Sequence, residues 1–354
     1  MPIHFDMDRM NAAFESHAKW WKGELDRPLI SITLTDAYPI EQKAPAPFLS
    51  QENCTQLHWT PEQIIDAMDE ELSKYEFLGD AYPNINFDVF GPGILAAMCG
   101  AKLDNSSGRV WFYTDPKLPI EETHVHYDPE NVWSKRIKDI YRAGMERWNG
   151  LVIMSMPDLG GILDVASSLL GCEELMYAFY DEPEEVHRLI GEIENAWYDA
   201  YWDLAAVLKP QRGFTDWAKV LSREPSFIPQ CDFCYMIGNP MFRSFVLDTL
   251  RKDTEILTNT MYHLDGAGQL PHLDDILALE KLNAIQWVPG AGSPESKHWI
   301  PVFQKITQAG KQFQIVGGPE DFLHIVKTLH GSPYYYQYMS VSERSIADEM
   351  LQAR

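Results

Sequence analysis

Apolar residues recur at helical spacing in several long segments of the chain. After Pro183 they are three or four positions apart from Val186 to Leu208, as expected for one buried face of a long helix. The segment Thr60-Pro61-Glu62-Gln63 combines a capping hydroxyl, a proline in the first turn and a glutamine three residues after the cap, so it predicts a helix start. The same signals predict helix starts at Asp128-Pro129, Asp181-Glu182-Pro183 and Asn239-Pro240.

Short apolar runs between these helices predict strands. They are residues 29–34, 85–90, 151–156, 213–217, 231–237, 260–264, 284–288, 312–316 and 334–339. From residue 151 onward, most runs are separated by helical stretches long enough for crossover connections, which favours parallel strands. We therefore predict an α/β fold, a (β/α)₈ TIM barrel. Nine runs for eight barrel positions leave one in excess, for which 213–217 is the first choice. A doubly wound open sheet is the alternative, but it lacks a dinucleotide-binding fingerprint.

The domain organisation follows from the absence of repeats and linkers in the sequence. We expect residues 1–354 to form a single barrel domain, in which residues 1–80 are an N-terminal extension with helical and loop segments and the first elements. The stretch from Ala37 to Thr60 is rich in Pro, Gln and Asn. It predicts a long loop over the mouth of the barrel.

Composition narrows the classes of partner. The formal net charge is −23, which repels phosphate backbones and anionic lipid, so neither nucleic acid nor a membrane is an expected partner. The N-terminal segment lacks the apolar region of a signal peptide, and no stretch approaches the about 18 apolar residues of a membrane span. Five dispersed cysteines indicate reduced thiols. We expect a cytoplasmic enzyme that acts on a small molecule.

Glycine-rich turns follow four of the predicted strands and locate the candidate chemistry. They lie at residues 157–161, 265–268, 289–292 and 317–319. Active sites of such barrels lie at the carboxyl ends of the strands, where glycine lets the backbone approach a ligand. A single glycine-rich turn is common in any α/β protein, so their repetition carries more weight. Asp158, in the first of these turns, is a candidate for binding substrate.

The strongest local cluster is Tyr262-His263-Leu264-Asp265-Gly266. Residues two apart on a strand share a face, so His263 and Asp265 should point together toward the barrel mouth. This pair suits metal ligation or general acid–base catalysis. The alternative is a buried histidine satisfied by an aspartate that caps the next helix. Tyr262 is a further candidate for substrate binding.

Two other predicted strands contribute candidates. Taken as a strand, residues 230–235 align Gln230, Asp232 and Cys234 on one face, which makes Asp232 a catalytic candidate near His263 and Gln230 a substrate contact. The same geometry separates Cys231 from Cys234 and disfavours a C-x-x-C zinc site. On the strand 284–288, Gln286 and Trp287 lie on opposite faces, and one of them must face the interior. Both are candidate substrate contacts, whereas Asp88 and Glu343 are weaker candidates.

Several of these segments resemble a known family. Residues 230–237, 239–242, 245–247, 262–266 and 285–292 are similar to segments of the uroporphyrinogen decarboxylase superfamily. This superfamily includes the decarboxylase and corrinoid-dependent methyltransferases of the trimethylamine-corrinoid-like branch. The resemblance implies a (β/α)₈ barrel. The decarboxylase branch is expected to carry an arginine-rich N-terminal stretch, but the first hundred residues contain only Arg9 and Arg27. The chain is therefore more similar to the methyltransferases.

The resemblance also implies a metal site, although the ligand residues of this chain differ from those of the family. The methyltransferases hold zinc with an H-x-C pair and a distant cysteine, whereas this chain has His263-Leu264-Asp265, and Tyr338-Met339-Ser340 contains no second cysteine. His263 and Asp265 could still bind Zn²⁺ through nitrogen and oxygen. Thiolate ligation is lost.

The function expected from these observations is methyl transfer from a small methylated substrate. The corrinoid would be carried by a separate partner protein, because no cobalamin-binding module is evident in this chain. Three alternatives stay open: a decarboxylase or lyase of a small carboxylated compound, a carbohydrate-active barrel that uses Asp232 and Asp265, and a non-catalytic ligand-binding barrel.

Overall fold

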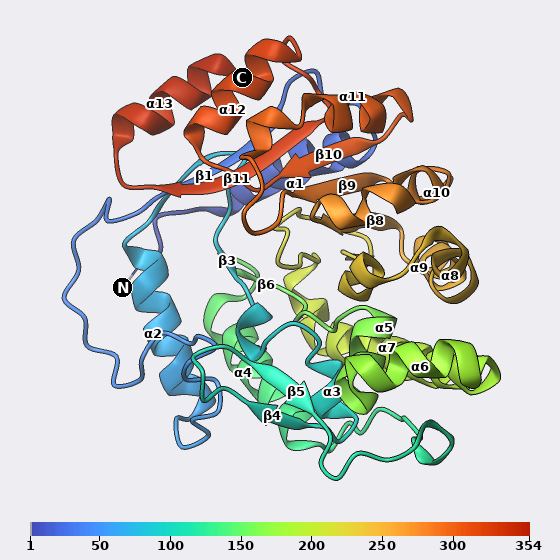
Figure 1. Ribbon diagram of the computed structural model, residues 1–354. Helices are drawn as coiled ribbons and strands as arrows, with labels where there is room; N and C mark the ends of the chain where they lie inside the picture. Colours follow the sequence, from blue (N-terminus) through green and yellow to red (C-terminus); the bar gives the residue numbers. More distant parts are fainter. Residues whose placement is uncertain (1) are drawn as a thin grey trace.

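A mostly parallel sheet organises the protein, whose computed structural model describes residues 2–354 (Figure 1). Its seven strands lie in the order β2 (Glu76–Gly79), β1 (Leu29–Leu34), β11 (Tyr335–Val341), β10 (Gln312–Ile315), β9 (Ala284–Val288), β8 (Asn259–Asp265) and β7 (Ser226–Phe227). Only β2 runs antiparallel to its neighbour, and the other pairs are parallel. The carboxyl ends of six strands therefore share one edge of the sheet.

Two smaller ladders complete the strands. β3 (Asn84–Ile85) pairs in parallel with β6 (Ile153–Met154), and β4 (Lys102–Asp104) pairs antiparallel with β5 (Trp111–Tyr113). Between residues 2 and 354, the β3–β6 ladder is not part of the seven-stranded sheet, in which β2 and β7 are the two edges. The fold is thus α/β with a central, mostly parallel sheet. Closure into an eight-stranded barrel stays a prediction.

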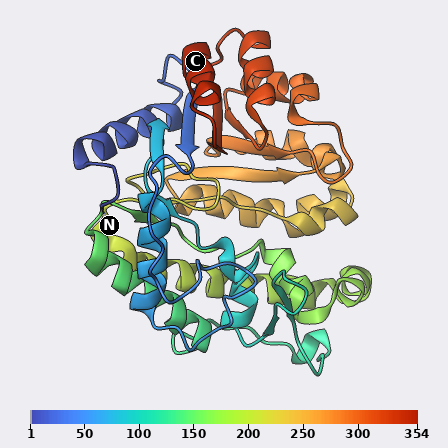
Figure 2. The same cartoon turned by 90° about the vertical axis from the view of Figure 1, so that its left-hand side faces the viewer.

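Helices surround these sheets in two groups. Figures 1 and 2 show one group beside β1, β10 and β11 and the other around β3 and β6. The first group comprises α11 (Ile300–Gln308), α12 (Pro319–Thr328) and α13 (Arg344–Ala353). The second comprises α2 (Pro61–Ser73), α3 (Leu95–Met98), α4 (Val132–Trp148), α5 (Ile162–Leu170), α6 (Cys172–Asp181) and α7 (Pro183–Leu208). The others are α1 (Met7–Trp21), α8 (Asn239–Phe245), α9 (Leu247–Ile256) and α10 (Leu273–Leu277). No helix within residues 2–354 has the length and apolar character needed to cross a bilayer.

Three of the four predicted helix starts are confirmed. In α2, the Thr60 hydroxyl accepts the Gln63 N–H at 3.3 Å and the Gln63 side chain accepts the Thr60 N–H at 3.0 Å. In α7, the whole predicted apolar face is buried. α8 begins at Asn239, as the Asn239-Pro240 signal predicts. The helix predicted at Asp128-Pro129 begins only at Val132, with Asn131 as its cap.

Most predicted strands of the large sheet are confirmed. β1 and β9 span the predicted residues, and β8, β10 and β11 differ from the prediction by one or two residues at their ends. The predicted strands 85–90 and 151–156 shrink to the short β3 and β6. Residues 213–217 form no strand, and Phe214 makes only an isolated antiparallel bridge with Ser222.

The strand predicted at residues 231–237 is wrong. These residues form the 3₁₀ helix η4 (Asp232–Met236). Asp164 of α5 accepts the backbone N–H groups of Asp232 (3.1 Å) and Phe233 (2.8 Å), so a side chain distant in sequence caps this helix. The two-residue alternation inferred for this segment does not apply. In a 3₁₀ helix, positions i and i+3 lie on the same side, so the argument that separated Cys231 from Cys234 also fails.

The inner face of the large sheet changes from apolar to polar along the strands. At the amino-terminal side, Trp20 and Trp21 of α1 pack in one cluster with Met261 of β8 and Ala284 of β9. Two residues further along β8 and β9 come His263 and Gln286, which are paired in register. The apolar layer anchors the strands, and the polar layer above it forms the candidate site.

Candidate active site

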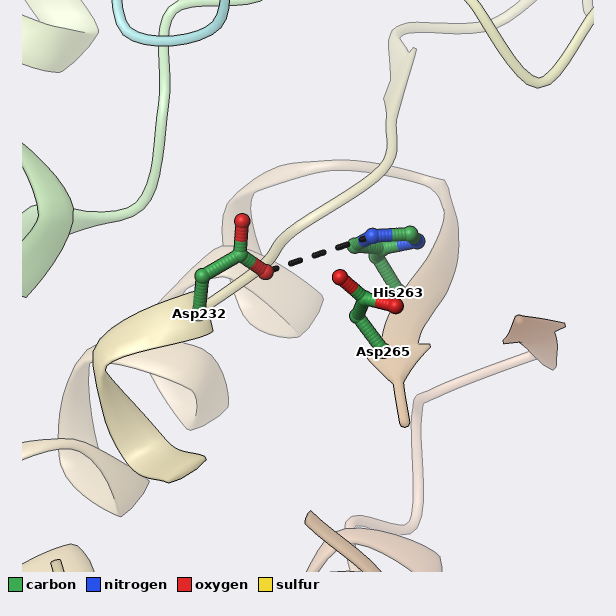
Figure 3. Close-up of side chains that lie close together, drawn as sticks. All are labelled: Asp232, His263 and Asp265. Atoms are coloured by element: carbon green, nitrogen blue, oxygen red, sulfur yellow. Dashed lines mark ion pairs between the residues drawn. The ribbon is translucent and has the colours of Figure 1, made fainter. Parts of the chain in front are cut away.

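The candidate site lies at the carboxyl end of β8, where three predicted residues meet (Figure 3). His263 and Asp265 come from β8, and Asp232 is the first residue of η4. The Nε2 atom of His263 lies 4.0 Å from Oδ1 of Asp232. One potential ligand atom from each of the three residues lies within 4.8 Å of the others. The structure thus brings together the three residues that the sequence analysis selected as catalytic.

A chain of side-chain hydrogen bonds orients the imidazole of His263. Its Nδ1 lies 2.6 Å from Oε1 of Gln286 in β9. Nε2 of Gln286 donates to Oε1 of Gln314 in β10 at 2.5 Å, and Nε2 of Gln314 donates to the carbonyl oxygen of Ala218 at 2.6 Å. We call these three side chains, His263, Gln286 and Gln314, the relay.

The carbonyl at the end of the relay fixes its direction. Because a carbonyl oxygen can only accept, Gln314 must present its NH₂ group to Ala218 and its oxygen to Gln286. Gln286 in turn presents its oxygen to His263, so Nδ1 carries the proton. In the neutral imidazole, Nε2 then holds a free lone pair on the side of Asp232. Burial lowers the pKa of His263, which favours this neutral form.

Trp217 encloses the imidazole from another side. Its ring meets the ring of His263 edge-on, with centroids 4.7 Å apart and an interplanar angle of 84°. Asp216 shapes this turn by accepting the Ala218 N–H at 2.9 Å. His263 is only 8% exposed as a result. The imidazole therefore meets a ligand mainly through Nε2.

Acidic side chains gather beside the site. Burial, followed by the negative charge of Asp265, raises the pKa of Asp232, although its side chain remains 54% exposed. Burial and the charge of Asp232 raise the pKa of Asp164 in the same way. Asp164 and Asp232 both line a cavity of about 280 Å³. A cation entering this cavity would relieve the repulsion between the carboxylates.

Asp158 forms the floor of this acidic region. Its Oδ1 accepts from the Gly160 N–H (2.9 Å) and from the side-chain amide of Gln230 (2.8 Å). Burial, and then the charges of Asp232 and Asp88, raise the pKa of Asp158 to about 8, against the Gly160 N–H that favours the ionised form. Asp158 is therefore protonated at neutral pH. The predicted substrate contacts Gln230 and Asp158 thus lie together, hydrogen-bonded to each other.

Two predicted substrate contacts lie elsewhere. Tyr262 and Trp287 face away from the relay, because each is one residue removed from a relay residue on its strand. The hydroxyl of Tyr262 donates to Oε1 of Gln269 at 3.0 Å, and the ring of Trp287 packs 4.8 Å from that of Trp299, next to α11. Both are fully buried in the outer packing layer. The structure does not bring them to His263.

The sequence analysis missed three residues that shape the site: Gln314, Asp164 and Trp217. Gln314 had a detectable signal, because a glutamine in the middle of a predicted buried strand, beside a strand with Gln286, indicates a polar layer. Asp164 lies in the first turn of α5, just after the glycine-rich segment 157–161. Nothing in the sequence indicates which N–H groups its carboxylate caps. Trp217 carried no signal.

Comparisons with known proteins bear on the fold. The sequence matches no protein-family profile and no curated protein sequence. The structure is similar to that of a methyltransferase from Methanosarcina mazei, with a TM-score of 0.63 and 12% sequence identity over 96% of this chain and 97% of the other. The two chains share their fold over nearly their whole length.

Proposed function

We propose that this protein is a methyltransferase with a uroporphyrinogen-decarboxylase-like (β/α)₈ architecture. It would transfer a methyl group from a small methylated substrate, with the corrinoid on a separate partner protein. His263, Asp232 and Asp265 would hold a divalent cation, for which zinc is the first candidate. The likeness in fold to a methyltransferase and the position of the cluster at the carboxyl ends of the strands support this proposal.

The observation that carries the proposal is the oriented lone pair of His263 opposite two carboxylates. Zn²⁺ binds neutral imidazole nitrogen and carboxylate oxygen at about 2.0–2.2 Å. Ligand atoms that share one Zn²⁺ at that distance lie roughly 3–3.5 Å from one another. The three candidate ligand atoms, within 4.8 Å of one another, can reach this separation by small side-chain rotations. A second hydrogen bond that fixes the tautomer is also what metal-ligating histidines generally have, and Gln286 provides it. The donor set therefore fits a divalent cation.

The residues divide the work of the site among them. A bound divalent cation would polarise the substrate or the methyl acceptor as a Lewis acid. Gln286 and Gln314 hold His263 in the ligating tautomer, and Trp217 excludes water from one side of the imidazole. Asp164 fixes the start of η4 and so holds Asp232 opposite His263.

Metal binding tests the proposal directly. Protein purified without chelator should contain stoichiometric zinc by elemental analysis, or take up Zn²⁺ or Co²⁺ in a titration. His263→Ala should abolish binding, and Asp265→Asn should weaken it, whereas His298→Ala, at an exposed position, should not change it. With metal bound, formation of methylcobalamin from reduced cobalamin and a panel of small methylated compounds, followed by absorbance, tests the transfer. A protein that takes up neither metal, with or without His263, would contradict the proposal.

Asp158 favours a second candidate, a decarboxylase or lyase of a small carboxylated compound. The carboxyl group of Asp158, protonated at neutral pH, is hydrogen-bonded to Gln230, whose backbone bridges that of the neutral His263. An acid and a base this close in the fold could act together without a metal. Turnover of a small carboxylated compound by metal-depleted protein would support this candidate.

The carbohydrate-active alternative rests on the carboxylate pair alone. One oxygen of Asp232 and one oxygen of Asp265 lie within 4.8 Å of each other. Release of sugar from a panel of glycosides would still be the direct test.

A further inference from the structure

A second and larger cavity opens at the carboxyl ends of other strands. Its volume is about 680 Å³, compared with about 280 Å³ beside Asp232. It is lined by Thr33 near the end of β1, Ser340 near the end of β11 and residues 48–52. We call this space the Lys219 cavity, after the lysine that lines it.

Lys219 is held rigidly at the wall of this cavity. Its backbone has a left-handed conformation, with φ of 59°. Its carbonyl oxygen accepts hydrogen bonds from the hydroxyls of Tyr336 (3.0 Å) and Tyr82 (3.3 Å). The ammonium lies 4.6 Å from the centre of the Tyr338 ring. These hydrogen bonds fix the backbone of Lys219, and its ammonium group is available to a ligand in the cavity.

The ammonium of the half-buried Lys219 has no ion pair with any residue that the structure describes, in contrast to the two lysines that are fully buried. Lys138 pairs with Asp203 at 2.7 Å, and Lys311 donates to the carbonyl oxygens of Leu279 and Leu282. Within residues 2–354, Lys219 has no carboxylate within 4.0 Å and no side-chain hydrogen bond, although the chain has 52 acidic residues. Even partial burial of a cation without an ion pair is unfavourable. A ligand that supplied the missing negative charge would remove this cost.

The other residues that line the cavity indicate the charge and the apolar character of the ligand that it could bind. Arg109, at the exposed rim, also has no ion pair among the described residues. Phe48, Leu49, Leu72, Tyr75 and Phe77 form an apolar wall. The acidic groups are Glu52, which is exposed, and Asp88, whose pKa is raised by burial against the opposing charges of Lys219 and Arg109. The cavity therefore offers cations for a negative group and an apolar surface for the rest of the molecule.

We propose that the Lys219 cavity binds a small organic carboxylate, with its carboxylate on Lys219 and Arg109 and its apolar part against Tyr75 and Phe77. This site goes beyond the proposed methyl transfer and does not depend on it. The turn that carries Lys219 nevertheless connects the two sites, because Trp217 contacts His263 and the carbonyl of Ala218 ends the relay.

Calorimetric titration with matched pairs of probes tests this site. We would use propionate, phenylacetate and 3-phenylpropionate, each beside its primary amide, which has the same shape without the charge. At least one acid should bind about tenfold more tightly than its amide, as a charge-assisted hydrogen bond provides. Lys219→Ala should abolish this preference, and Lys219→Arg should retain most of it. Equal binding of all acids and amides, or an unchanged preference in Lys219→Ala, would overturn the proposal.

Controls separate this site from the candidate active site and from loss of folding. Lys281→Ala removes a lysine that lines a different cavity and should leave carboxylate binding unchanged. Lys219→Ala should also take up Zn²⁺ as the wild type does, because its side chain is not part of the metal cluster, so that failure of the metal site and failure of the carboxylate site are distinguishable. Asp88→Asn leaves Lys219 in place but removes the carboxylate whose negative charge acts on it. Carboxylate probes should therefore bind more tightly to this variant. Weaker binding in Asp88→Asn would contradict an anion site.

Discussion

His263 acquires its chemical character from residues that do not touch a ligand. The direction of the relay is set by the carbonyl of Ala218, and it determines which imidazole nitrogen is free. The sequence places His263 and Asp265 on one face, but a two-residue period cannot show which nitrogen the histidine presents. That information lies in pairings between β8, β9 and β10, which only the folded sheet provides.

The relay predicts that Gln314 affects metal binding without contacting the metal. Gln314→Leu should leave Gln286 free to turn its NH₂ group toward His263, which would favour the wrong tautomer. We expect zinc affinity to fall about 10- to 100-fold, as for other residues that orient metal-ligating histidines. Competition titration with a chromogenic chelator measures this effect. Gln337→Leu, a buried glutamine of β11 outside the relay, is the control for general damage to the sheet. Equal losses in both variants would contradict the prediction.

Asp158 predicts a pH dependence of stability. Its pKa in the folded protein is about 8, well above the ordinary 3.8. Between these values the folded protein keeps a proton that the unfolded chain releases, so the free energy of unfolding falls as pH rises toward about 8. Asp158→Asn cannot release this proton, so its free energy of unfolding should not show this fall. Between these pH values it should rise relative to that of the wild type by up to about 1.4 kcal/mol per pH unit. Urea denaturation between about pH 5 and about pH 9 tests this, with the exposed Asp181→Asn as control. A difference that is constant with pH would contradict it.

At the scale of elements, the predictable parts of the fold are those whose signals are local. β1 and β9 are short runs in which buried apolar residues predominate, and α2 carries its complete capping box. The segment at residues 231–237 has a similar apolar composition but is the 3₁₀ helix η4, because Asp164 caps it from α5. Asp232 nevertheless lies where the sequence analysis placed it, although the strand that was meant to carry it is not there. The short strands β3 and β6 were overestimated because apolar runs do not show where pairing stops.

Because Asp164 caps η4, we predict that its replacement lowers both the free energy of unfolding and the metal affinity of the candidate site. Asp164→Ala should remove two hydrogen bonds and cost about 1–2 kcal/mol of unfolding free energy. It should also weaken metal binding, because Asp232 is no longer held opposite His263. Thr60→Ala removes the cap of α2, which is distant in sequence from every candidate ligand, and should cost about 1 kcal/mol without changing metal affinity. Denaturation and metal titration of both variants decide the point. Unchanged metal affinity in Asp164→Ala would show that η4 positions Asp232 without this cap.

At the scale of the whole molecule, Asp80 joins parts of the chain that the sequence analysis treated separately. Its carboxylate accepts from both Nη atoms of Arg27 at 2.7 Å and from the Ile30 N–H at 3.2 Å. Its carbonyl lies 3.1 Å from Nε2 of His17 in α1, and Arg354 at the end of the chain is 3.7 Å from its carboxylate. Such convergence depends on tertiary packing and has no local signal. The net charge of the chain narrows the expected classes of partner, but neither length nor charge indicates this contact.

The Arg27–Asp80 pair should therefore contribute much more to stability than an ordinary surface pair. Burial alone would raise the pKa of Asp80, but the hydrogen bonds and charge of Arg27 outweigh burial and lower it. Arg27→Ala leaves a carboxylate that is 5% exposed without its main partner, which should cost about 2–4 kcal/mol. Arg142→Ala, which breaks an exposed pair with Asp139, should cost less than about 1 kcal/mol. Urea denaturation at neutral pH compares the two. If both losses are equally small, water or Arg354 replaces Arg27, and the junction at Asp80 is not what ties α1 to the sheet. A large loss confined to Arg27→Ala, restored in part by also replacing Asp80 with Asn, would show that the unpaired buried charge is its cause.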